Sequence, residues 1–489
     1  MVTTRLHFAD DARRRIVRGA TQVARLVELT LGPAARTVLI ERAPAGPLVG
    51  SSGYDVALHV ELVCPVEQIG AQAMRNVAWE VSDRWGDGTA TVVCLAAALL
   101  QSLDRAETRG CERRALAEAL DAEIDEVVAA LTRSATPVME DDDLRRVIET
   151  AAGGPDLSPL LFEAALRAGP QGYVDVVPAA ESDALEVVQG LAFDGGWLSP
   201  SFAASGADRI VLENTYVVAF DGAVQSIDEI GPMLDVFVRM DQPLLFVATS
   251  FSEDAKERLG SLVRRTGAKI AAMRAPGEGD WRRFHLGDIA AATGATLFGD
   301  EGGYSLRTVR PELIGRAKKV ELTAKESRFY GGAGGLPELD FRKAQIRGDI
   351  ARSRYLSLDR ERHEKRLALF FSGIVTLSLG GRTEPERALR IGSAQRAVQA
   401  IRAARQSGSI AGGGLALRDA GRALGNGSIT GRAFEAPFRA LSVNGATDAT
   451  VSPRDPCNLV IDVVRRAAAT AASLVSTNVA ITHPRRLAN

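Results

Sequence analysis

The sequence predicts a multidomain α+β protein in which helical regions at both ends of the chain enclose an inserted α/β region. Apolar residues recur at helical spacing through the first 133 residues and again, in Ala-rich stretches, after residue 377. Between them, after Pro137 and the acidic run 140–143, the apolar pattern alternates as in strands. The chain has 489 residues, and single cores stop growing at roughly 250 to 300 residues. We therefore expect two or three domains.

The first helical region begins with an amphipathic helix over residues 11–29, which the Leu31-Gly32-Pro33 turn ends. A strand pair is expected at residues 37–40 and 48–49, around a loop with two prolines. Further helices are expected at residues 69–81, 95–103 and 116–131.

The inserted region contains short apolar runs that read as buried strands, at residues 174–177, 185–188, 217–220, 244–247 and 270–273. A helical pattern at 252–265 separates two of these runs, and a charged helical pattern at 341–369 leads to another strand at 374–377. Buried strands that alternate with helices indicate an α/β domain.

The composition is that of a soluble globular protein, with 46% apolar residues, 25% charged residues and a net charge of -2. It indicates neither a nucleic-acid nor a membrane partner. The four cysteines form no C-x-x-C pair, which favours free thiols in a reducing compartment. Residues 1–10 contain no apolar run, and the uncharged run 467–482 is too short and polar to span a bilayer, which takes about 20 residues. We expect a cytoplasmic protein.

The most informative short motif is Gly86-Asp87-Gly88-Thr89-Ala90-Thr91, which lies between two helical patterns. This motif places two glycines, a carboxylate and two hydroxyls at the start of a helix. Such a combination can form a phosphate-binding site with a metal ligand beside it. The alternative is a capped turn without a ligand, in which Asp87 or Thr89 is the N-cap. No Gly-Lys dipeptide occurs, which excludes a Walker loop, and the five histidines show no zinc-binding spacing.

Five sequence blocks occur in order: 29–33 (LTLGP), 86–89 (GDGT), 190–200 (GLAFDGGWLSP), 275–280 (APGEGD) and 411–414 (AGGG). Together they resemble the group I (GroEL-like) chaperonins, the bacterial ring-forming protein-folding machines, over nearly the whole chain. The resemblance implies a mainly helical equatorial domain (1–133 and 408–489), a small intermediate domain (134–189 and 374–407) and an α/β apical domain (190–373). It also implies hinges at Pro137 with Gly408 and at Gly190 with Gly373, although ordinary loops would explain these residues too.

The resemblance implies ATP and magnesium as ligands of a weakened site. The phosphates would contact two segments and one glycine of the AGGG block: Thr30, Leu31, Gly32 and Pro33; Asp87, Gly88, Thr89, Ala90 and Thr91; and Gly413. Asp87 would hold the metal. Ala90 replaces a threonine of the family.

Two carboxylates of the family site are replaced, one by Ser52 and one by Arg396, and the segment that reaches the adenine and ribose is missing after Gly445. Losing a general base typically lowers the rate on the order of 100- to 10,000-fold. We therefore expect weak nucleotide binding with impaired hydrolysis, unless Asp419 or Asp55 supplies the missing acid. Arg396 either clamps a phosphate or lies on a solvated helix face.

In the family, apical helices and a nearby loop bind non-native proteins. The residues at matching positions here are Trp197, Phe202, Leu234 and Leu262. Core packing is the alternative for Leu262, and packing beneath the loop for Trp197. Several apolar family positions are polar or glycine here, so we expect weaker client capture and weaker binding of the lid co-chaperonin.

Three functions follow from these observations. The first is a chaperonin-like protein with impaired or absent ATP hydrolysis, acting as a dedicated holdase, an assembly partner or a subunit of a mixed ring. The second is an active ATP-dependent folding chaperonin, and the third is a self-assembling scaffold without clients. In each case we expect an oligomer, in which the strand pair near residues 37–49 could pair with a neighbour.

Overall fold

A computed structural model describes most of the chain: residues 4–32, 36, 38–41, 48–50, 53–108, 111–138, 141–152, 156–169, 172–180, 182–202, 207–299, 310–353, 357–370, 373–445 and 452–483. The chain divides into two compact units. Unit 1 contains residues 1–162, 178–182 and 379–489, and unit 2 contains residues 163–177 and 183–378. Helices and sheets confirm the predicted multidomain α+β class, whereas the three-domain division stays a prediction.

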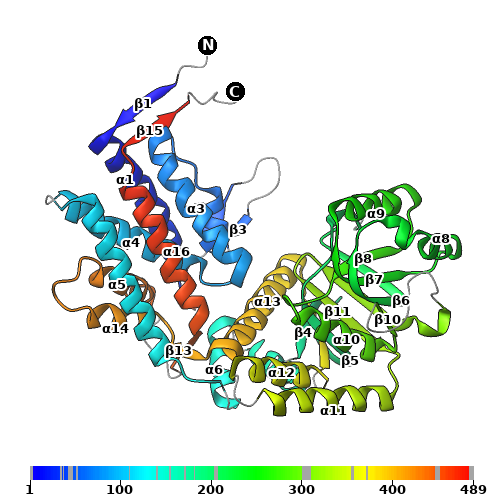
Figure 1. Ribbon diagram of the computed structural model, residues 1–489. Helices are drawn as coiled ribbons and strands as arrows, with labels where there is room; N and C mark the ends of the chain where they lie inside the picture. Colours follow the sequence, from blue (N-terminus) through cyan, green and yellow to red (C-terminus); the bar gives the residue numbers. More distant parts are fainter. Residues whose placement is uncertain are drawn as a thin grey trace. The chain divides into compact units, whose positions relative to one another are not determined.

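Unit 1 is mainly helical (Figure 1). Its helices are α1 (Ala9–Glu28), α2 (Gly53–His59), α3 (Pro65–Trp85), α4 (Thr89–Thr108), α5 (Arg113–Ser134), α6 (Asp141–Ala152), α13 (Glu384–Ser407), α14 (Leu415–Ala423), η5 (Gly431–Glu435), α15 (Ala436–Val443) and α16 (Cys457–Val475). Helix α7 (Ser158–Ala168) includes the point where the chain passes into unit 2. The predicted helix at 11–29 is confirmed as α1.

Helices α1 and α3 approach closely because each has a glycine at the crossing. A Cβ atom on Gly19 would lie 1.9 Å from the Glu67 carbonyl oxygen, and one on Gly70 would lie 2.1 Å from the Ile16 carbonyl oxygen. Side chains from α1, α3, α4, α5 and α16 then form one hydrophobic core. Along α4, the residues from Val92 to Ala97 are all buried. The start of α4 is therefore held firmly in unit 1.

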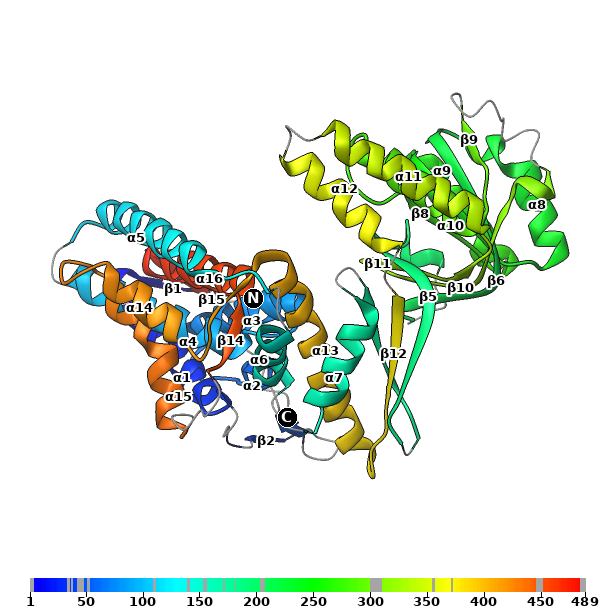
Figure 2. The ribbon, with the colours of Figure 1, turned by 90° about the horizontal axis from the view of Figure 1, so that it is seen from below.

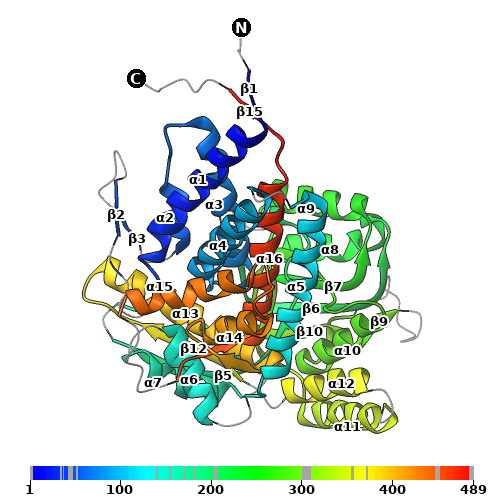
Figure 3. The ribbon, with the colours of Figure 1, turned by 90° about the vertical axis from the view of Figure 1, so that its left-hand side faces the viewer.

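Three short strand pairs complete unit 1. Strand β1 (Arg5–Phe8) pairs antiparallel with β15 (Val479–Thr482), so the first and last described elements lie side by side (Figure 1). The predicted strand pair near residues 37–49 is present as β2 (Val38–Ile40) and β3 (Leu48–Gly50) (Figure 3). Strand β13 (Ser409–Ala411) pairs with β14 (Arg454–Pro456).

Unit 2 is built on a nine-stranded sheet in the order β4-β12-β5-β11-β10-β6-β7-β8, with β9 paired to β6. Figure 2 shows β12, β5, β11, β10 and β6 of this sheet. The strands are β4 (Tyr173–Pro178), β5 (Ala184–Asp194), β6 (Arg209–Val224), β7 (Leu244–Phe251), β8 (Ile270–Arg274), β9 (Leu297–Gly299), β10 (Gly315–Thr323), β11 (Glu326–Gly332) and β12 (Gly373–Leu379). Strands β6, β7 and β8 run parallel, and the predicted apolar runs within them are largely buried.

The helices of unit 2 are α8 (Gly231–Met240), α9 (Glu253–Thr266), α10 (Trp281–Thr293), α11 (Leu336–Arg352) and α12 (Ser357–Leu369), with short turns η1 (Pro200–Phe202), η2 (Ile227–Glu229) and η4 (Pro311–Leu313). Helix α9 confirms the predicted helix at 252–265. Among the described helices, none is both long and apolar enough to cross a membrane.

Both predicted hinge pairs are in contact within their own unit. In unit 1, Gly408 has φ +77°, and a Cβ atom there would lie 2.7 Å from the Thr136 carbonyl oxygen, next to Pro137. In unit 2, a Cβ atom on Gly190 would lie 2.7 Å from Ile374 Cδ1, beside Gly373. Glycine is therefore required sterically at both positions, while movement about them stays a prediction.

Candidate functional site

The first segment of the candidate site is the turn after α1. The Thr30 hydroxyl donates a hydrogen bond to the Val27 carbonyl oxygen (2.7 Å), and Leu31 is buried. Gly32 has φ +87°, a backbone conformation that favours glycine. Asn444, just after α15, donates its amide to the carbonyl oxygen of Leu31 (3.0 Å). The turn is thus held from a distant part of the chain, and Pro33 lies outside the described residues.

The second segment is the turn between α3 and α4. Gly86 ends α3 in the left-handed conformation, and its N–H donates to the Ser82 carbonyl oxygen (2.9 Å). Gly88 has φ +80°, and a Cβ atom there would lie 3.0 Å from Leu459 Cδ2. Both glycines are therefore structurally required. Asp87 Oδ1 accepts a hydrogen bond from the Gly88 N–H (2.7 Å), and α4 begins at Thr89.

The start of α2 packs directly on the first turn of α4. A Cβ atom on Gly53 would lie 2.8 Å from Ala90 Cβ. Thr89 is buried, whereas Ala90 and Thr91 are half-buried. A larger side chain at position 90 would need this approach to loosen, so the replacement of threonine by Ala90 matches the close packing. Ser52, which precedes α2, lies outside the described residues.

Gly413 and Asp455 form the third side of the site. Strand pairing places Asp455 opposite Ile410, directly before the AGGG turn. The Gly413 N–H donates to the Asp455 carboxylate. Burial, followed by the negative charge of Asp87, raises the pKa of Asp455 to about 7, although the Gly413 hydrogen bond opposes this shift. The structure therefore brings Asp87, Gly413 and a second carboxylate together.

Asp455 was not predicted as a site residue. Its position depends on the β13–β14 pairing, which joins segments more than 40 residues apart. The available signal was the Asp455-Pro456 dipeptide immediately before an apolar stretch, because a short acidic residue before a helix often lies near the helix N–H groups.

The two carboxylates fit a magnesium ion bound together with phosphate. Magnesium is commonly held by one or two protein carboxylates plus the oxygens of substrate phosphates. Among the residues that the structure describes, no cluster of three or more His, Cys, Asp or Glu side chains could hold a metal ion. A metal here would therefore need Asp87, Asp455 and oxygens from the phosphate itself.

Arg396 lies on α13 and is half-buried. Its Nη2 donates to Ser393 Oγ on the same helix (2.8 Å). One turn further along α13, Gln399 Cγ would lie 3.9 Å from a Cβ atom on Gly86. Of the two alternative acids, Asp419 is exposed and pairs with Arg418 (2.8 Å), and Asp55 lies in the first turn of α2.

The four predicted client-binding residues do not form an exposed patch. Leu234 has an exposed fraction of 0% and Phe202 is buried, because both belong to the core of unit 2. Trp197 and Leu262 are half-buried and pack against that core. In this conformation, Leu234 and Phe202 are core residues, which corrects the expected exposure of these two side chains.

Two other apolar residues of α8 are exposed, and neither was predicted from the sequence. Val236 is 41% exposed and Met240 is 60% exposed. The helical period of the buried Met233, Leu234 and Phe237 could have located this outer face.

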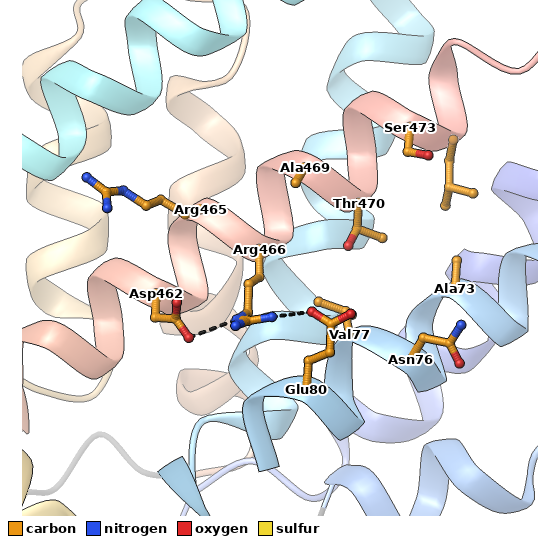
Figure 4. A pocket seen from close by; sticks show the side chains of 11 residues that line it. Ala73, Asn76, Val77, Glu80, Asp462, Arg465, Arg466, Ala469, Thr470 and Ser473 are labelled. Atoms are coloured by element: carbon orange, nitrogen blue, oxygen red, sulfur yellow. Dashed lines mark hydrogen bonds and ion pairs between the residues drawn. The ribbon is translucent and has the colours of Figure 1, made fainter. Parts of the chain in front are cut away.

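A separate groove of about 530 Å³ lies between α3 and α16 (Figure 4). On its wall, Arg466 pairs with Glu80 and with Asp462 (2.8 Å), as the dashed lines in Figure 4 show. Asp462 also accepts a hydrogen bond from Trp85 Nε1 (2.8 Å), the residue before Gly86. Side-chain contacts therefore link the groove to the Gly86–Thr89 turn, but Asp87 and Asp455 do not line it.

The fold defines a chaperonin-type protein, in which the Gly86–Thr89 turn lies in the helical unit. The chain belongs to the TCP-1/cpn60 chaperonin family, whose model matches residues 23–449. Similar solved structures include the chaperonin gp146 from the bacteriophage EL 2 (Pseudomonas aeruginosa), crystallised in the presence of ATP-BeFx. Crystal form II has 19% sequence identity and a TM-score of 0.75, covering 98% of this chain and 99% of that chain. Crystal form I has 20% identity and a TM-score of 0.68, with the same coverage.

Proposed function

We propose that this protein is a chaperonin subunit that assists the folding or assembly of client proteins, binds ATP with magnesium, and hydrolyses ATP slowly or not at all. The observation that carries the proposal is the combination of a retained phosphate and metal seat with an arginine at position 396. The seat consists of the Gly86–Thr89 turn, Gly413 and the Asp87–Asp455 carboxylate pair.

Nucleotide binding is supported by the local geometry. The first turn of α4 offers backbone N–H groups that have no partner within the helix, and its positive dipole end favours anions. The left-handed Gly88 keeps this end of α4 free of a side chain. Thr30 is a weaker contributor than the resemblance implies, because its hydroxyl hydrogen is already donated to Val27.

Impaired hydrolysis is supported by the side chains that replace the family acids. A cation at position 396 cannot accept a proton from water, and Ser52 is a poor base at neutral pH. One observation favours the alternative of an active enzyme: Asp455 is a second carboxylate beside Asp87, and a pKa of about 7 suits a general base. Asp55 and Asp419 are further candidates for that role.

Assembly into a homo-oligomer or mixed ring is supported by exposed apolar strands. Leu6 and Phe8 on β1, with their partners Ile481 and Val479 on β15, are all exposed on one face of the strand pair. For client binding, the exposed Val236 and Met240 on α8 are better placed than Leu234. The small apolar area favours selected clients over general capture and a lid. The cytoplasm remains the expected location.

Steady-state phosphate release with Mg-ATP tests the proposal, with Asp87→Ala as the control and light scattering to measure the particle mass. We expect release equal to that of Asp87→Ala, together with measurable binding of ATP by calorimetry. Release clearly above the control would support the active alternative. An oligomer that neither binds ATP nor prevents aggregation of any client would support the scaffold alternative.

A further inference from the structure

Arg396 is an arginine of α13 whose charge is not paired within the described part of the chain. Its one hydrogen-bond partner there is the neutral Ser393 Oγ. Other arginines on this helix have acceptors elsewhere: Arg387 donates to the Ala179 carbonyl oxygen, and Arg390 to that of Gly380. A guanidinium carries five N–H donors, so most of those on Arg396 remain available.

The side of α13 that carries Arg396 faces the rest of unit 1. Residues three and seven positions apart share one side of a helix, so Arg396, Gln399 and Ala403 point in similar directions. Ala403 is buried, and Gln399 Cγ lies near the Gly86–Thr89 turn, 3.9 Å from where a Cβ atom on Gly86 would be. Arg396 is only about 4.5 Å further along the helix axis than Gln399, and its side chain is longer. The solvated-face alternative is therefore disfavoured.

We propose that Arg396 is an anion-binding residue of the candidate nucleotide site, where its guanidinium binds the terminal phosphate of a nucleoside triphosphate held on the Gly86–Thr89 turn. This inference rests on the nucleotide binding proposed above. A forked guanidinium matches phosphate oxygens with two parallel hydrogen bonds. The site then distinguishes triphosphate from diphosphate by charge, and retains the triphosphate because the residue at this position cannot act as a base.

The chemistry of the site explains why a cation is tolerated there. Asp87 belongs to the Gly86–Thr89 turn, and the Asp455 carboxyl group interacts with it electrostatically. Arg396 lies one turn before Gln399 on α13, and Gln399 is the α13 residue nearest to where a side chain on Gly86 would begin. A bound triphosphate would place its metal toward the carboxylates and its outer oxygens toward the arginine, so the charges of all groups would be complementary.

Calorimetry on the full-length protein with magnesium, using ADP and the non-hydrolysable analogue AMP-PNP, tests the proposal. We expect the wild-type protein to bind AMP-PNP about tenfold or more tightly than ADP. Arg396→Ala should reduce the ratio of AMP-PNP affinity to ADP affinity to about one, mainly by weakening the binding of AMP-PNP. Arg396→Lys should retain part of the difference. Arg402→Ala, an equivalent change on another side of α13, should leave the ratio unchanged.

The ratio of AMP-PNP affinity to ADP affinity distinguishes phosphate binding by Arg396 from a merely structural role. A structural role would weaken the binding of both nucleotides equally. An unchanged ratio in Arg396→Ala, while Asp87→Ala abolishes binding, would overturn this inference and leave the proposed function standing. If the wild-type protein binds neither nucleotide, the proposed nucleotide binding and this inference both fail.

Discussion

Asp455 is the residue whose protonation most directly reports on the candidate site. Its pKa is raised to about 7 by burial and by the charge of Asp87, whereas an aspartate in an unfolded chain titrates near 3.9. Between about pH 4 and pH 7 the folded protein therefore binds more protons than the unfolded chain. The free energy of unfolding consequently falls as the pH rises through this window.

Asp455→Asn should remove this pH dependence, because the amide stays neutral and can still accept the Gly413 hydrogen bond. Without nucleotide or metal, we expect the variant to melt above the wild-type protein at pH 8, with a difference that shrinks toward pH 5. Each unit of pKa shift corresponds to about 1.4 kcal/mol. Thermal unfolding across pH 5–8 measures the effect. Asp419→Asn, at an exposed position, is the control, and a pH-independent difference would contradict the assignment.

For individual site residues, the sequence predicted those that lie close together along the chain. The Gly86–Thr91 turn and its glycines follow from local backbone requirements, which short motifs encode. Asp455 and Asn444 reach the site only through tertiary packing. Their roles could not be predicted, because nothing in the neighbouring sequence specifies which turn they contact.

In unit 2, a buried cluster of charged side chains joins helices α10 and α12. Asp288, with an exposed fraction of 0%, accepts two hydrogen bonds from Arg366 (2.8 Å each) and one from Arg342 of α11 (2.8 Å). The Arg366 guanidinium also lies 4.7 Å from the centre of the Phe284 ring. One carboxylate thus fixes the helix pair α11–α12 to α10.

Asp288→Ala should destabilise unit 2 strongly, because it removes both 2.8 Å hydrogen bonds to the buried Arg366 and leaves the longer ion pair with Asp349, at 3.6 Å, to balance its charge. Breaking a buried ion pair in this way costs about 3 to 5 kcal/mol. Urea unfolding should show this loss, and hydrogen exchange should show faster opening of α11 and α12. Glu364→Ala removes an exposed pair with Arg360 on α12 and should change stability by less than about 1 kcal/mol. If the two variants lowered the free energy of unfolding equally, Asp288 would not be what fixes α11 and α12 to α10.

The sequence predicted the helices and strands whose apolar pattern is strong, such as α1, α9 and β7, whereas α2, α8 and β10 were not predicted. The charged pattern at 341–369 is an instructive exception. It forms two helices, α11 and α12, and α11 begins five residues earlier than the pattern suggested. The surfaces of both helices are mostly polar. The break between them therefore interrupts no apolar stripe and could not be seen in the sequence pattern. Tertiary contacts such as those of Asp288 determine where they pack.

For the whole molecule, the apolar strand surfaces of unit 1 suggest how subunits associate. A two-stranded ribbon is marginally stable alone, and the β1–β15 pair exposes Leu6, Phe8, Val479 and Ile481 on one face. The second pair, β2–β3, exposes Leu39 to 70%. Pairing of β2–β3 from one subunit with β1–β15 of the next would bury both surfaces and satisfy the free strand edges.

Leu39→Asp should therefore break the assembly without unfolding the subunit. A carboxylate buried in an apolar interface is strongly unfavourable, so the concentration at which the particle dissociates should rise about tenfold or more. Light scattering over a dilution series measures this, and circular dichroism checks that the subunit remains folded. Leu358→Asp is the matched control, because Leu358 is similarly exposed but lies on α12 of unit 2. If Leu39→Asp and Leu358→Asp give particles of the wild-type mass, the strand pair is not the subunit contact. The exposed apolar faces of β1 and β15 would then need another partner.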